Sequence, residues 1–169
     1  LMENLQLVLN QKGIKSVRHY CYTRLDDLLQ KERIQLNTFF GNLIHDILQA
    51  FPELKEVKEQ KYASSLSELN LLLNNIPSPT FLIIDGLDHI ERIFHFRSYS
   101  EISRQDIAII ETLEKLVTSP LVKIIVTSQN VPQLKEISSF YRVAVPDWSE
   151  ENVKTFLGKM RIRNRLVKK

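Results

Sequence analysis

The stretch FLIIDGLDHIERI, residues 81–93, decides how the rest of the chain is interpreted. Its apolar start runs directly into Asp85, and a second acid, Asp88, follows three positions later with His89 behind it. A continuous apolar run is typical of a parallel strand that is covered on both faces. Ligands bind outside the carboxyl ends of such strands, where one carboxylate can hold Mg²⁺ and another can orient or deprotonate water. The alternative is an ordinary strand that ends in an acidic turn.

Strand and helix patterns alternate along the whole chain. Strands are predicted at 14–22, 80–84, 122–128 and 141–145, and helices at 1–11, 37–51, about 65–76, 104–118 and from Ser149 onward. This order predicts an α/β domain of three layers with a mainly parallel sheet. Because parallel crossovers are right-handed, the strand ends at Asp85 and at Thr127-Ser128 are expected at one edge of that sheet.

Composition describes an ordinary globular chain. Its 169 residues suit a single domain, with 43% hydrophobic and 25% charged residues. No apolar run approaches the roughly 20 residues that a membrane span needs, and no export signal begins the chain. Cys21 is the only cysteine, so an internal disulfide is impossible and a cytoplasmic location is predicted. Leu1 precedes Met2, which suggests that the chain was cut from a longer one.

The basic residues are unevenly distributed. Residues 159–169, KMRIRNRLVKK, hold six of the 23 lysines and arginines and none of the 20 acids. The body of the chain is therefore mildly acidic and the tail strongly basic. Such a tail contacts nucleic acid or another anionic surface, or it is a solvated helix end that has lost its partner.

Two possible metal ligands, His19 and Cys21, lie outside the acidic stretch. His19 and Cys21 alternate along the predicted strand at 14–22. Two ligands without a partner motif do not make a metal site, so both are predicted to have a core or edge-strand role.

Three segments resemble the STAND-type P-loop NTPases, in the NACHT-like branch that includes many prokaryotic antiviral sensors. FLIIDGLDH at 81–89 looks like their Walker B segment, and VKIIVTSQ at 122–129 is similar to their sensor-1 strand. YRVAVPDWSEENVKTFL at 141–157 looks like the strand and helix that lead into their helical or winged extension. The resemblance implies a P-loop NTPase fold of the ASCE type.

The resemblance also implies roles for the residues at the two strand ends. Asp85 would coordinate Mg²⁺, and Asp88 would be the catalytic or water-positioning acid. The expected nucleotide-binding residues are Asp85, His89, Thr127, Ser128 and Gln129. His89 replaces the acid that many relatives carry, and Gln129 stands where arginine is common, so it offers an amide hydrogen bond but no charge to a γ-phosphate.

One part of the family pattern is missing. The phosphate-binding sequence G-x-x-x-x-G-K-[ST] does not occur around any of the four glycines. The opening helix resembles the one that follows this loop in the family. The resemblance thus implies a partial NTPase core at 1–147, without its first strand and P-loop, and the start of a helical or winged extension at 148–169. In the family's strand order, the missing strand lies between those at 122–128 and 141–145.

Two functions of different classes follow. The first is the nucleotide-binding core of a STAND ATPase, an ATP- and Mg²⁺-dependent signalling switch in innate immune or antiviral defence. The intact protein would self-associate into oligomers and sense a foreign protein through another domain, whereas this chain alone is expected to bind nucleotide poorly. The second is a non-catalytic α/β interaction module in which the acidic turn is only structural. No membrane partner is expected.

Overall fold

The centre of the protein is a small parallel sheet. A computed structural model describes residues 2–21, 26, 28–59, 64–90, 108–129, 139–145, 147 and 149–159. Its strands are β1 (Lys15–Tyr20), β2 (Thr80–Asp85) and β3 (Val122–Val126), in the order β1-β2-β3. Both neighbouring pairs are parallel, which confirms the predicted α/β class with a parallel sheet. The strands predicted at 80–84 and 122–128 are neighbours as expected, since β2 pairs directly with β3 and their carboxyl ends lie at the same edge of the sheet.

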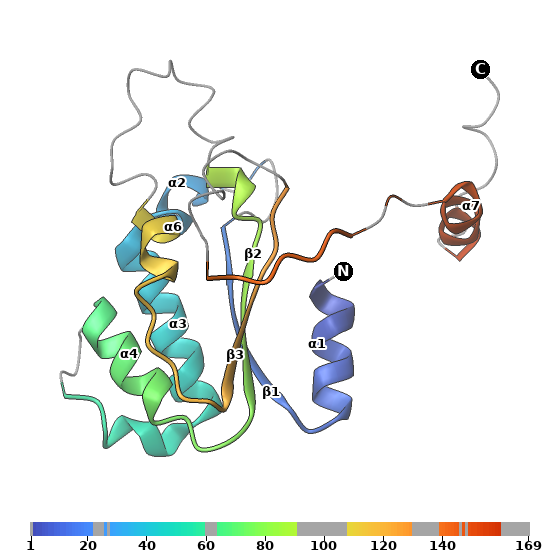
Figure 1. Cartoon of the computed structure of the whole chain (residues 1–169). Helices are drawn as coiled ribbons and strands as arrows, with labels where there is room; N and C mark the ends of the chain where they lie inside the picture. The colour runs from blue at the N-terminus through green and yellow to red at the C-terminus, as the bar shows by residue number, and fades with distance from the viewer. Residues whose placement is uncertain are drawn as a thin grey trace, which may run out of the picture. The chain divides into compact units, whose positions relative to one another are not determined.

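Helices cover both faces of this sheet (Figure 1). Helix α1 (Met2–Gln11) lies on one face, whereas α3 (Leu36–Ala50), α4 (Leu66–Asn74) and α6 (Ala108–Leu113) lie on the other. Alternate side chains of β1 explain this division, because successive residues of a strand point to opposite faces. Arg18 donates a hydrogen bond to Gln6 of α1, while the ring of His19 packs edge-on against Phe39 of α3.

The core lies between the sheet and α3. Helix α3 has apolar residues at helical spacing, and Phe39, Leu43 and Ile47 are fully buried. Leu82 and Ile84 of β2 are fully buried, and Ile83, which points to the opposite face of the sheet, is buried as well. The continuous apolar run of β2 is therefore covered on both faces, as its sequence predicts.

Short elements connect these main ones. Helix α2 (Gln30–Arg33) precedes α3, and the 3-10 helix η1 (Pro52–Lys55) follows it. The predicted stop of α1 is confirmed, since Gly13 has a positive φ of 68°. The predicted cap of α4 is confirmed as well, because the Ser65 hydroxyl accepts a hydrogen bond from the Glu68 N–H.

Two helix boundaries differ from the prediction. Helix α3 begins at Leu36, so its N-cap is Gln35, two or three residues before the caps expected at Asn37 or Thr38, and Gln35 makes no side-chain cap. Helix α6 ends at Leu113 rather than near 118, so Val117 is 56% exposed instead of buried. The loop after α6 is held by Asn70, whose side chain bonds to the backbone of Lys115 and Val117. That tertiary contact competes with a further helical turn.

The segment 141–145 is not a strand, so this prediction is wrong for the structure. Its alternating apolar residues Tyr141, Val143 and Val145 are exposed, at 93%, 75% and 68%. A strand needs a hydrogen-bonded partner, and the sheet has no fourth strand among the described residues. The β-type pattern is therefore present without the neighbour that would make it a strand.

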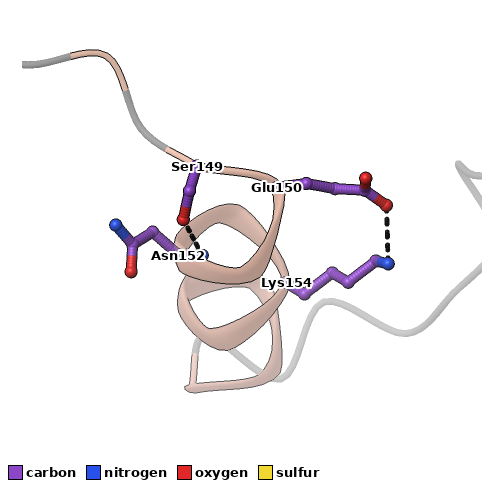
Figure 2. Close-up of polar contacts among 4 residues, drawn as sticks. All are labelled: Ser149, Glu150, Asn152 and Lys154. Atoms are coloured by element: carbon purple, nitrogen blue, oxygen red, sulfur yellow. Dashed lines mark hydrogen bonds and ion pairs between the residues drawn. The ribbon is translucent and has the colours of Figure 1, made fainter.

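The chain divides into two compact units, at 1–139 and 140–169. This division falls eight residues before the predicted boundary at 147/148. The second unit contains α7 (Glu150–Lys159), whose start was predicted at Ser149. Figure 2 shows the Ser149 hydroxyl accepting a hydrogen bond from the Asn152 N–H at 3.1 Å, and Glu150 paired with Lys154 at 2.6 Å. The basic tail lies almost wholly beyond 159 and so falls outside the described residues.

None of the described helices combines the length and the apolar character required to cross a bilayer.

Candidate functional site

The candidate site is the edge of the sheet where the parallel strands end. β2 and β3 are paired in register through Ile84 and Val126, so the residues that follow them start from neighbouring positions. The backbone N–H groups of Gly86 and Leu87 both donate to the Thr127 carbonyl, each at 3.1 Å. Gly86 has a φ of 77°, a conformation that other residues adopt only with strain. It turns the chain so that the second acid returns toward the same edge.

Asp85 and Thr127 are joined directly. The Thr127 hydroxyl donates a hydrogen bond to Oδ1 of Asp85, and it also accepts one from the Gly86 N–H at 3.3 Å. Asp85 and Thr127 are both half-buried, so part of this pair remains accessible at the edge. A carboxylate beside a hydroxyl provides the hard oxygen ligands that Mg²⁺ prefers.

Asp88 lies deeper than Asp85. It is 3% exposed, and its Oδ1 accepts a hydrogen bond from the Gln129 N–H at 3.2 Å. Asp88 is helical, as are His89 and Ile90, and its hydrogen bond fixes the loop that follows β3. This geometry gives Asp88 a structural role, and the water-positioning role that the sequence suggests stays a prediction.

The remaining predicted residues surround this pair of acids. His89 is half-buried, and its N–H donates to the Gly86 carbonyl at 2.9 Å. Ser128 and Gln129 are exposed, and the Ser128 hydroxyl donates to the Gln129 carbonyl at 2.7 Å. The structure thus brings all six predicted residues to one edge of the sheet.

Cys21 is a neighbour of the site that the sequence placed only in the core. Its N–H donates to the Asp85 carbonyl at 2.9 Å, and its side chain is fully buried. Burial, together with the negative charges of Asp85 and Asp88, raises the pKa of the thiol to about 12. The thiol therefore stays protonated and is no nucleophile. The strand register explains this position, because Cys21 follows Tyr20, which pairs with Asp85. The sequence alone does not contain that register.

His19 also has the predicted core role. Its Nε2 lies 2.8 Å from the Arg33 carbonyl, and its Nδ1 lies 3.5 Å from the Asn42 side-chain nitrogen. Burial lowers the pKa of His19 to about 4, so the ring is neutral and Nε2 carries the proton.

The fit of this edge to Mg²⁺ and ATP is partial. Within the described ranges, no three acid, histidine or cysteine side chains lie together in a way that could hold a metal ion. A magnesium ion at Asp85 would therefore complete its shell with the Thr127 hydroxyl, water and nucleotide oxygens, which is the usual mode for this ion. Helix α1 runs opposite to the strands, with its N-terminal end toward their carboxyl half (Figure 1). A helix N-terminus so oriented favours phosphate on that side.

Comparisons with protein-family models, curated proteins and solved structures found no match for this chain.

Proposed function

We propose that the chain is the nucleotide-binding core of a STAND-type ATPase, in which ATP and Mg²⁺ act as a signalling switch. The observation that carries the proposal is the direct bond between Asp85 and Thr127 at the carboxyl edge of two adjacent parallel strands. In P-loop NTPases an aspartate at this position holds Mg²⁺, and the neighbouring strand end lies beside the γ-phosphate.

The open side of the sheet supports the finer form of this proposal. β3 is an edge strand of the described sheet, and segment 141–145 has the residues of a strand without being one. Both features are expected of an ASCE-type sheet whose first strand and P-loop are supplied by sequence not included in this chain. The 169 residues contain no phosphate-binding loop, so hydrolysis is proposed only for a protein that contains one.

In such a protein each residue has a defined task. Mg²⁺ would polarise the phosphates when it is bound. Asp85 would hold the ion, and Thr127 would orient that carboxylate through its hydrogen bond. Asp88 would fix the loop through the Gln129 backbone N–H, and the Gln129 side-chain amide would donate a hydrogen bond to a phosphate oxygen. ATP-dependent self-association in defence signalling is proposed from the family resemblance alone.

The test is substitution of Asp85 in a protein that carries the phosphate-binding loop. Asp85→Asn keeps the size of the side chain but removes the charge, so Mg²⁺-dependent ATP hydrolysis should fall by about 100-fold or more. Asp46→Asn, on α3 and away from this edge, is the matched control and should leave turnover unchanged. Unchanged turnover in Asp85→Asn would reject the assignment.

A second function, that of a non-catalytic interaction module, is favoured by the hydrogen bonds that both acids make within the protein. Asp85 bonds Thr127 and Asp88 bonds Gln129, which is sufficient to explain an acidic turn in a non-catalytic interaction module. Labelled ATP titrated with and without Mg²⁺ separates the two functions. Micromolar, Mg²⁺-dependent binding contradicts the interaction module, and its absence in the loop-containing protein contradicts the ATPase.

A further inference from the structure

A pocket lies along α4 and is formed by residues other than those of the candidate site. Its volume is about 390 Å³. The acidic residues in its lining are Glu59 and Glu68, and the rest of the described lining is serine, asparagine, leucine and valine. No lysine, arginine or histidine is among the described lining residues, so the described wall carries only negative charge.

Glu68 distinguishes this pocket from a cluster of surface acids, because its side chain is buried. Its side chain belongs to a residue that is only 5% exposed, and its Oε1 has no hydrogen-bond partner among the described residues. In a complete capping box, Glu68 would accept the Ser65 N–H while its own N–H bonds the Ser65 hydroxyl. Only the second half is formed, at 3.3 Å. Oε1 is enclosed by protein, so a ligand in the pocket would meet the carboxylate through its other oxygen, and a cation with N–H groups would offset the cost of burying that charge.

The pocket wall is already rigid, which restricts the kind of ligand. Asn70 is held on both sides, since its Nδ2 donates to the Lys115 carbonyl at 3.2 Å and its Oδ1 accepts the Val117 N–H at 3.0 Å. The hydroxyls of Ser65 and Ser67 lie 3.0 Å apart and remain able to accept hydrogen bonds. The wall therefore offers acceptors at fixed positions around a carboxylate.

We propose that this pocket binds a guanidinium group, carried either by a small molecule or by an arginine of a peptide. The volume accommodates a group of several heavy atoms, and no described cluster has the three acid, histidine or cysteine ligands expected of a metal site. A guanidinium is planar and presents five N–H donors, so one of them can donate to the accessible oxygen of the Glu68 carboxylate while others reach the neighbouring hydroxyls. Glu68 supplies the carboxylate, and Glu59 at the rim adds a second negative charge.

The experiment is an NMR titration of the ¹⁵N-labelled chain with n-butylguanidinium, with the peptide Gly-Arg-Gly, and with neutral n-butylurea. Saturable shifts of amides in residues 65–74 are expected with a guanidinium probe and not with the urea. Shifts with the peptide alone identify a protein arginine as the source, and comparable shifts with both identify the guanidinium itself. Glu68→Gln should weaken binding by about tenfold or more, whereas Glu111→Gln, an exposed acid on α6, should not change it.

Two results would overturn the proposal. One is the lack of saturable shifts with both guanidinium probes. The other is unchanged affinity in Glu68→Gln. If that variant does not fold, Glu59→Gln replaces it, because Glu59 is exposed and its change does not disturb the core. Unchanged affinity in Glu59→Gln would then overturn the proposal, and weakened affinity would support it.

Discussion

Acidification should destabilise this protein through one buried histidine. His19 is 1% exposed, and its ring is neutral in the folded state because burial lowers its pKa from 6.5 to about 4. This net value of the pKa includes an opposing effect of the hydrogen bond to the Arg33 carbonyl and a smaller lowering by the Arg33 charge. In the unfolded chain the same ring has its ordinary pKa near 6.5.

The direction of the effect follows from which state binds the proton first. As the pH falls through about 6.5, the unfolded chain takes up a proton that the folded chain refuses, so stability is lost between about pH 6.5 and 4. A shift of this size corresponds to about 3 kcal/mol in full, of which about 2 kcal/mol is lost between pH 7.5 and pH 5.

The assay is urea unfolding followed by circular dichroism at both pH values, with linear extrapolation to water. His19→Gln keeps a donor toward the Arg33 carbonyl but cannot titrate, so its stability should change by less than about 1 kcal/mol between the two pH values. His45→Gln is the matched control, since His45 is exposed on α3 and its loss should leave the full pH dependence. A wild-type protein that is equally stable at both pH values would refute the reasoning, as would an unchanged pH dependence in His19→Gln.

Two further predictions use matched pairs. Leu43→Ala should lower the free energy of unfolding by about 2–5 kcal/mol, because Leu43 is fully buried. Leu48→Ala on the same helix should lower it by about half as much or less, because Leu48 is only half-buried. Equal losses in urea unfolding would contradict the core placement of Leu43. Gly13→Ala should cost about 1–2 kcal/mol, since its positive φ strains any side chain although the space is open. Gly41→Ala, inside α3, should instead raise stability by about 0.5–1 kcal/mol, because its added Cβ would lie 3.5 Å from the Ser64 hydroxyl, an ordinary contact distance. Thermal unfolding that ranks the two variants the other way would exclude this account.

Prediction from the sequence succeeded where the signal was local. The run before Asp85 identified β2 and its burial on both faces, and Gly13 identified the end of α1. Hydrophobic periodicity and turn residues are properties of a few neighbouring positions, so they can be read without the rest of the fold. The candidate edge was found for the same reason, because parallel strands end together.

It failed where the outcome depended on a distant partner. The segment 141–145 has the residues of a strand, but the described sheet offers it no pairing. Helix α6 was expected to continue to 118, but Asn70, more than forty positions earlier, binds the loop that replaces its last turn. The intrinsic preference for a strand or a helix is small compared with such tertiary contacts.

From its sequence alone, this protein is an alternating α/β chain with acids and hydroxyls at the ends of two buried strands. The tertiary structure alone decided how these groups are used: Asp85 bonds Thr127, Asp88 is buried against Gln129, and Glu68 is enclosed without a donor. The physical reason is that desolvation and hydrogen bonding depend on which atoms are brought within about 3 Å of each other, and local patterns do not contain those distances.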